Sequence, residues 1–150
     1  MIDVRENKIK DAISKLEETK TYALSDTGLA FQLGLIYRAD NQRDKAQAEF
    51  ERAVALDPNY ANARYFLGLL YDEAGEKIKA IEQFQKVVDL NPDNETLKKI
   101  LEGLKTGRKA ADVIAELQPA QPPVQEKPAE QLPSPSPTPS VSPSPLPKKK

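Results

Sequence analysis

The sequence predicts an all-α fold of stacked antiparallel helix hairpins, followed by a disordered tail. A pattern that occurs twice at one fixed spacing, about 34 residues, is the main observation behind this prediction. Its first copy is Leu33-Gly34, Tyr37, Ala46, Phe50, Ala53 and Pro58, and its second copy is Leu67-Gly68, Tyr71, Ala80, Phe84, Val87 and Pro92. A fixed period of this length is typical of stacked repeats and not of a single closed core.

A change of composition after Leu117 predicts the end of the folded part. Eleven of the 13 prolines lie in residues 118–150, mixed with serine and glutamine. Such a segment has too little apolar surface to offset its ordering entropy, so we expect it to be disordered and partly polyproline II.

Apolar periodicity and breakers place the helices in order. The predicted helices cover residues 3–19, 27–40, 43–56, 60–73, 77–90, 95–105 and 108–117. Ser25 or Asp26 is placed to cap the second helix. Pro58 and Pro92 end the third and fifth helices, because proline cannot continue the hydrogen-bond ladder. The last two helices are the weakest and are separated by Gly107.

The repeated glycine and phenylalanine predict how the helices of one hairpin pack. Gly34 and Gly68 lie in mid-helix, where glycine costs about 1 kcal/mol relative to alanine. We therefore expect the neighbouring helix to pass too close for a side chain at these positions. Phe50 and Phe84 would fill the space between the helices. The tyrosine of each copy would close the first helix against the second.

These residues resemble the tetratricopeptide repeat. The period, the Leu-Gly pair, the tyrosine, the alanine at positions 46 and 80 and the terminal proline all agree over residues 27–60 and again over residues 61–94. The bulky aromatic residue that often precedes the Leu-Gly pair is absent, since Ala30 and Arg64 stand there. The resemblance implies a short right-handed superhelix whose first helices line a concave groove, and it implies a binding function.

The N-terminal segment resembles an incomplete repeat. Ala12 and Leu16 lie one full period before Ala46 and Phe50, so residues 1–26 correspond to the second helix and loop of an earlier repeat. A helix without its partner would leave part of its apolar stripe uncovered. Three explanations are open: the chain is a piece of a longer array, the loop folds back with Tyr22 and Leu24 over the gap, or two chains pair as a homo-oligomer through this helix.

The C-terminal segment, residues 95–117, resembles a degenerate capping pair. Its leucines keep the buried stripe, but Glu102 replaces the glycine and Lys105 replaces the tyrosine. Charged residues on its outer face suit the end of a repeat stack.

The resemblance also predicts a partner-binding groove, in which apolar and aromatic residues form the floor and polar residues form the rim. Its residues are Phe31, Leu35, Arg38, Asn62, Tyr65, Leu69 and Asp72. Their spacing agrees, because residues three and four apart share one face of a helix. The alternative is that the four apolar side chains pack between repeats. Arg38 and Asp72 are expected to be solvated charges, with a weak ion pair across the groove as a further possibility.

One known binding mode of the family is not expected. Some members grip the C-terminal carboxylate of a chaperone with lysine, arginine and asparagine side chains. The corresponding positions here hold Phe31, Leu35, Phe66, Thr96 and Ile100. We therefore do not predict a chaperone-tail partner.

The composition excludes several other classes of function. The chain has no cysteine and no histidine, which removes the thiolate nucleophile, the commonest general base and the commonest metal ligands. We expect no enzyme activity, no cofactor and no metal site. The net charge is −1, and −3 without residues 118–150, which hold four lysines and two glutamates. This balance argues against a nucleic-acid partner.

No apolar run approaches the roughly 20 residues that cross a bilayer, so no direct membrane insertion is expected. The first residues carry no hydrophobic signal region, and a cytoplasmic location is the default expectation.

Binding of a peptide or partner segment in the groove is thus the predicted function. Two alternatives are a partner-recruiting C-terminal appendage of a larger membrane or cell-envelope enzyme, and a self-assembling structural scaffold.

Overall fold

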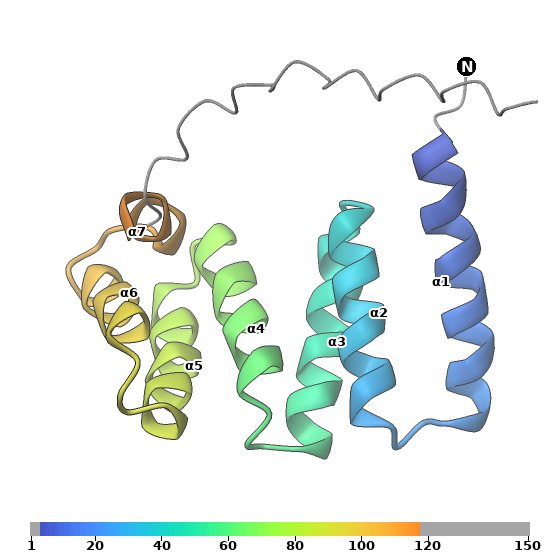
Figure 1. Cartoon of the computed structure of the whole chain (residues 1–150), viewed down its shortest axis with the longest axis horizontal. Helices are drawn as coiled ribbons and strands as arrows, with labels where there is room; N and C mark the ends of the chain where they lie inside the picture. Colours follow the sequence, from blue (N-terminus) through green and yellow to red (C-terminus); the bar gives the residue numbers. More distant parts are fainter. Residues whose placement is uncertain (1–3, 118–150) are drawn as a thin grey trace, which may run out of the picture. The chain divides into compact units, whose positions relative to one another are not determined.

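The computed structural model describes residues 4–117, and over this range the protein is all-α, as predicted (Figure 1). Its helices are α1 (Val4–Tyr22), α2 (Thr27–Ala39), α3 (Arg43–Leu56), α4 (Ala61–Glu73), α5 (Lys77–Leu90), α6 (Glu95–Lys105) and α7 (Ala110–Leu117). These ranges follow the predicted ones closely, although α1 continues past residue 19 and α7 begins after residue 108. The tail predicted to be disordered lies outside the described residues.

Helices α2 and α3 form one antiparallel pair, and α4 and α5 form the next pair beside it (Figure 1). Asp26 caps α2 as predicted, because its side chain accepts a hydrogen bond from the Leu29 amide at 2.9 Å. The turns inside the pairs use left-handed residues, Asn41 at φ 57° and Gly75 at φ 82°. The residue after each turn donates its amide to the carbonyl of the repeat tyrosine, which closes the helix C-terminus.

The glycine and phenylalanine of each repeat pack directly against one another. Phe50 and Phe84 are fully buried. A Cβ atom added at Gly34 would lie 2.5 Å from the Phe50 ring, and one added at Gly68 would lie 2.9 Å from the Phe84 ring. The predicted close approach of the paired helices is therefore confirmed, and it depends on the missing side chain.

The repeat tyrosines also connect successive hairpins, a role that the sequence did not predict. The Tyr37 hydroxyl donates a hydrogen bond to Glu17 in α1, and the Tyr71 hydroxyl donates one to Glu51 in α3 at 2.8 Å. Both rings also face a lysine from the second helix of their own hairpin, Lys45 and Lys79.

The same link recurs at the next interface with different residues. Lys105 stands where the tyrosine would be, and its ammonium group donates a hydrogen bond to Gln85 at 3.0 Å. Lys105 and Gln85 lie one full period after Tyr71 and Glu51. The partners of Tyr37 keep the same register, so α1 takes the place of the second helix of a preceding repeat.

Replacement of Tyr71 with phenylalanine tests this link. Burial and the hydrogen bond to Glu51 raise the pKa of Tyr71 well above its usual value, so the hydroxyl stays protonated and remains a donor at neutral pH. We expect the free energy of unfolding to fall by about 1 kcal/mol in urea titrations, since one part-buried hydrogen bond is lost. Tyr22→Phe is the control, because Tyr22 is 87% exposed and its loss of a hydroxyl should change nothing. Equal effects of the two changes would contradict the link.

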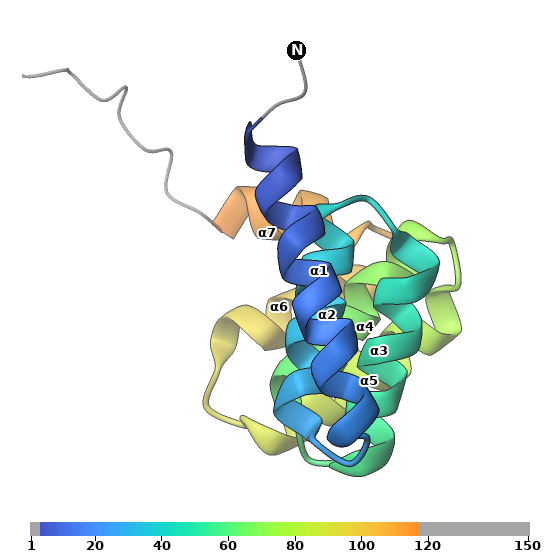
Figure 2. The ribbon, with the colours of Figure 1, turned by 90° about the vertical axis from the view of Figure 1, so that its right-hand side faces the viewer.

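Helix α1 covers one end of the stack (Figure 2), and its apolar residues pack against the core. Ile13 is buried, and Ile9 and Leu16 pack against the core beside α2. Over residues 6–22, the exposed side chains of α1 are polar except Tyr22. Over residues 6–22 the apolar side chains of α1, apart from Tyr22, are therefore at least half-buried.

The connection from α1 to α2 does not fold back over the core as one alternative predicted. Tyr22 and Leu24 are 87% and 63% exposed, so that alternative is wrong. The buried carboxylate of Glu49 in α3 instead pairs with Lys20 and with Arg52. Arg52 also donates a hydrogen bond to the Leu24 carbonyl at 2.7 Å. These polar contacts hold the connection at the edge of the stack.

At the other end of the stack, α7 packs on α6 and reaches α4 (Figure 1). A Cβ atom added at Gly103 would lie 2.4 Å from Val113 in α7. Glu102 does replace the repeat glycine, as predicted, but the next residue provides a close approach of the same kind. No helix within residues 4–117 is both long and apolar enough to cross a membrane.

Candidate functional site

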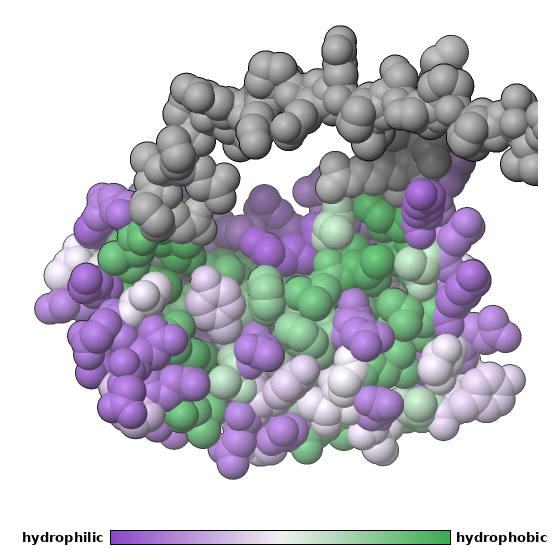
Figure 3. Space-filling model, viewed as in Figure 1, coloured by the Kyte–Doolittle hydropathy of each residue, from purple (hydrophilic) through white to green (hydrophobic). Residues whose placement is uncertain are grey.

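The predicted groove residues lie on α2 and α4, the first helices of the two complete hairpins. Most of them are half-buried, and Asn62 is exposed. Figure 3 shows apolar residues gathered over the middle of this side of the molecule, across α2 and α4, with hydrophilic residues toward its edges. We use the name groove face for Phe31, Leu35, Arg38, Asn62, Tyr65 and Leu69.

Two aromatic residues of the groove face are anchored by rings beneath and beside them. The Phe31 ring lies 5.9 Å from the Phe50 ring and 5.8 Å from the Phe66 ring, measured between centroids. The Tyr65 ring lies 5.5 Å from both the Phe66 ring and the Phe84 ring. Packing between repeats, the alternative expected from the sequence, therefore accounts for one side of Phe31 and Tyr65. Their other side remains partly exposed.

Phe66 was not predicted to support the groove face, yet it links the two repeats. Its ring stacks on Phe50 at 5.6 Å and carries the Arg38 guanidinium at 5.4 Å from its centroid. The same arginine acts on Tyr65: burial raises the pKa of Tyr65, while the positive charge of Arg38 opposes the rise. Arg38 thus lies over the aromatic floor and close to the tyrosine.

Arg38 pairs with Glu73 and not with Asp72, so the ion pair considered from the sequence is wrong. The Arg38 and Arg43 guanidinium nitrogens lie 3.7 and 3.6 Å from the two Glu73 carboxylate oxygens. These three side chains line a depression of about 250 Å³ together with Leu35, Ala39 and Asn41. Neither Arg43 nor Glu73 was singled out from the sequence, because they lie at helix ends outside the predicted face.

Asp72 is not a solvated charge on the rim, which corrects the prediction for this residue. It is 5% exposed, and one carboxylate oxygen lies 2.6 Å from the Lys77 ammonium nitrogen. The other oxygen accepts a hydrogen bond from the Ala110 amide at the start of α7, at 2.7 Å. Lys77 also donates a hydrogen bond to the Arg108 carbonyl at 2.7 Å. Asp72 therefore holds α7 in place and is not available to a partner.

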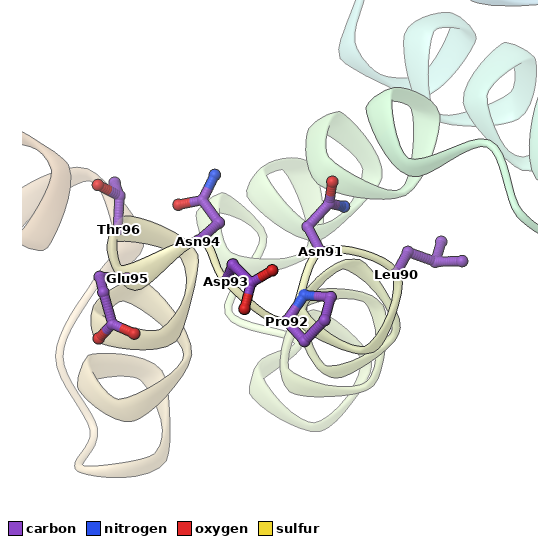
Figure 4. Close-up of a pocket in the computed structure, with 7 residues that line it drawn as sticks. All are labelled: Leu90, Asn91, Pro92, Asp93, Asn94, Glu95 and Thr96. Carbon is purple, nitrogen blue, oxygen red and sulfur yellow. The ribbon is translucent and has the colours of Figure 1, made fainter.

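A depression of about 630 Å³ lies between α5 and α6 and is lined by residues 90–96 (Figure 4). The side chains of its two asparagines form hydrogen bonds with the backbone at the helix ends. Asn91 donates a hydrogen bond to the Val87 carbonyl at 2.9 Å, and Asn94 accepts one from the Leu97 amide at 3.1 Å. We therefore interpret this depression as a surface feature formed by the turn between α5 and α6, and not as a binding site. No cluster of metal-ligating side chains occurs within residues 4–117.

Comparison with known proteins supports the repeat assignment. A family model described as tetratricopeptide repeat matches residues 31–95. No curated protein matches the chain. The chain is similar to the structure of TTC0263, a thermophilic TPR protein in Thermus thermophilus, with 26% sequence identity and a TM-score of 0.59. That match covers 71% of this chain and 55% of the Thermus protein.

Two further structures share the fold at lower identity. The first TPR of Spaghetti (RPAP3), solved with the HSP90 peptide SRMEEVD, is 18% identical, with a TM-score of 0.61 over 69% of this chain and 82% of that chain. The Yersinia enterocolitica chaperone SycD, solved with a peptide of the translocator YopD, is 14% identical, with a TM-score of 0.57 over 76% of this chain and 86% of that chain. The repeat register, the helix pairs and the matching family model agree, and over residues 31–95 the chain consists of tetratricopeptide repeats.

Proposed function

We propose that this protein binds a peptide segment of a partner protein on the groove face and that it has no catalytic activity of its own. The observation that carries the proposal is the partial exposure of four large apolar side chains, Phe31, Leu35, Tyr65 and Leu69, on the first helices of two adjacent repeats. Aromatic and aliphatic anchors in a shallow groove are the usual means of holding an amphipathic or extended peptide.

The similar structures support the same proposal. The Spaghetti (RPAP3) and SycD structures were each solved with a peptide of a partner protein. Tetratricopeptide repeats are typically non-catalytic, and the absence of histidine and cysteine from the sequence is consistent with this. The alternative of self-assembly through α1 has less support, since the apolar residues of α1 face α2.

A comparison of two double variants tests the proposal. Leu35→Gln/Leu69→Gln changes the groove face, whereas Leu56→Gln/Leu90→Gln changes two leucines at the ends of α3 and α5. The pairs are matched, because each consists of two leucines at equivalent positions of the two repeats. Leu56 and Leu90 are each 39% exposed, and Leu35 and Leu69 are half-buried, so circular dichroism would check that both double variants are folded.

Peptides are first selected on the wild-type protein from a phage-displayed random library and then synthesised. We expect Leu35→Gln/Leu69→Gln to weaken their binding roughly tenfold or more in fluorescence anisotropy, because two apolar contacts are lost. The Leu56→Gln/Leu90→Gln variant should bind like the wild type. Equal binding by both variants, or failure to select any peptide, would contradict the proposal.

A further inference from the structure

We propose that the depression at the end of the groove face, lined by Leu35, Arg38, Arg43 and Glu73, is a subsite for an acidic side chain of the bound peptide. The inference rests on the proposed function and deepens it, since it names the chemistry of the ligand. The two arginines would bind the carboxylate, and Leu35 would contact the neighbouring apolar part of the peptide.

The first argument is charge. Two guanidinium groups share one carboxylate, so the site keeps an excess of one positive charge although residues 1–117 carry a net charge of −3. Asp72, the one acid among the predicted groove residues, is buried and already paired with Lys77. An anionic group is therefore favoured at this place despite the acidic balance of the folded part.

The second argument is unused hydrogen-bonding capacity. The Arg38 and Arg43 nitrogens lie 3.7 and 3.6 Å from Glu73, beyond the usual range of about 2.7–3.2 Å for such hydrogen bonds. Neither guanidinium donates a hydrogen bond to any other residue within the described range 4–117. Each carries five N–H donors in a fork that matches a carboxylate. Glu73 thus shows that the two arginines attract a carboxylate, but it leaves their N–H donors free to bind another one.

The third argument is access and position. The side chains of Arg38 and Arg43 are 38% and 65% exposed, and the depression of about 250 Å³ is open between them. Phe66 lies under the Arg38 guanidinium at 5.4 Å and restricts it to the aromatic floor of the groove face. A peptide that lies along Phe31, Leu35 and Tyr65 would pass this site.

The subsite differs from the chaperone-carboxylate clamp of the family. The positions that correspond to that clamp hold apolar residues and a threonine here. The arginines belong instead to the last turn of α2 and the first residue of α3. We therefore expect recognition of an acidic side chain within the peptide rather than of a free C-terminus.

The test measures coupling between the arginines and one acidic residue of the probe. The probe is a synthetic peptide taken from the random-library selection on the wild-type protein, together with a version in which its aspartate or glutamate is replaced by the amide. We expect selected peptides to be enriched in an acidic residue at a fixed distance from an apolar one. The amide version should bind the wild type about threefold to tenfold more weakly, and this difference should shrink at high salt.

Two variants with opposite expected effects complete the test. In Arg38→Ala/Arg43→Ala the acidic and amide peptides should bind equally, whereas the control Lys8→Ala/Lys10→Ala, which removes the same charge from an exposed part of α1, should behave like the wild type. Glu73→Gln should bind the acidic peptide about threefold to tenfold more tightly, because the competing carboxylate is gone. A gain of affinity cannot arise from misfolding.

The outcomes separate the two proposals. Selected peptides that depend on Leu35 and Leu69 but show no acidic preference would overturn the subsite and leave the proposed function standing. An equal penalty for the amide peptide in the wild type and in Arg38→Ala/Arg43→Ala would overturn the subsite as well. Peptides that bind without dependence on Leu35 and Leu69 would overturn the proposed function and the subsite together.

Discussion

Phe50→Ala is expected to lower the free energy of unfolding by about 3–5 kcal/mol, enough to unfold much of the protein near physiological temperature. The Phe50 ring is fully buried and packs against Phe31 and Phe66 from both repeats. Its removal therefore leaves a cavity that extends from its own hairpin to the junction with the next one. Urea titration followed by circular dichroism would measure the loss, and Leu90→Ala, at a half-exposed position, would serve as the control.

Gly34→Ala tests the same contact, because we expect this change to destabilise the protein when Phe50 is present and to stabilise it when Phe50 is absent. In the wild type, the new Cβ atom would lie 2.5 Å from the ring, and overpacking of this kind costs about 1–3 kcal/mol. The gain in helix propensity, about 1 kcal/mol, does not offset the larger clashes. In the Phe50→Ala background the ring is absent, so the same change should stabilise the protein by up to about 1 kcal/mol.

The double-mutant cycle tests whether the close approach is the reason for the glycine. Destabilisation by Gly34→Ala in both backgrounds would show that another contact or the backbone itself requires glycine at this position. Stabilisation in both would show that the helices can move apart at little cost.

The repeat fold could be predicted because one set of contacts recurs at one spacing. Gly34 packs on Phe50, and Gly68 packs on Phe84, with the same separation along the chain in both repeats. A sequence period therefore encodes the helix ends and the contacting partners together. The same reasoning placed Phe31, Leu35, Tyr65 and Leu69 on one side of α2 and α4, since residues three and four apart share a helix face.

Contacts made by α7, at one end of the stack, do not follow the period, and these were missed. Gly103 approaches Val113 in α7, one position after the residue that the period indicates. Asp72 is neutralised by Lys77 and accepts a hydrogen bond from the amide of Ala110, which is distant in sequence. Sequence spacing cannot show that a carboxylate will be buried, because its burial depends on which helix terminus the fold brings to it.

Polar partners on the groove face were missed for a related reason. Arg38 was assigned correctly to the face, but its partner Glu73 lies one position beyond a full period, at the end of α4. The period directs attention to Asp72, which occupies the matching position and points elsewhere. A shift of one residue on a helix turns a side chain by about 100°, which is enough to exchange a buried position for an exposed one.

Asp72→Ala is expected to release α7 from α4 and to lower the free energy of unfolding by about 2–3 kcal/mol. The change removes the acceptor of the Ala110 amide, which is a buried hydrogen bond of 2.7 Å to a charged group. It also leaves Lys77 without its carboxylate, although this loss is reduced because the Lys77 side chain is 35% exposed and stays hydrated. Hydrogen exchange measured by mass spectrometry should show faster exchange in residues 110–117 than in α2 and α3.

Two control variants separate the carboxylate's roles. Glu73→Ala removes the neighbouring acid, which lies on the surface, and should change stability by less than about 0.5 kcal/mol. Asp72→Asn keeps an oxygen that can accept from the Ala110 amide while losing the charge that attracts Lys77, so α7 should stay docked with a smaller loss. Unchanged exchange of residues 110–117 in Asp72→Ala would show that α7 is held by its apolar contacts alone.

Release of α7 should also change the exposure of residues on the groove face. Tyr65 and Leu69 belong to the same apolar cluster as Ile114 and Leu117 of α7. Undocking of α7 would therefore uncover more of Leu69, and Asp72→Ala should change the binding of selected peptides even though Asp72 itself is buried. A peptide whose affinity is the same for the wild type and for Asp72→Ala must bind nearer to α2, around Phe31 and the two arginines.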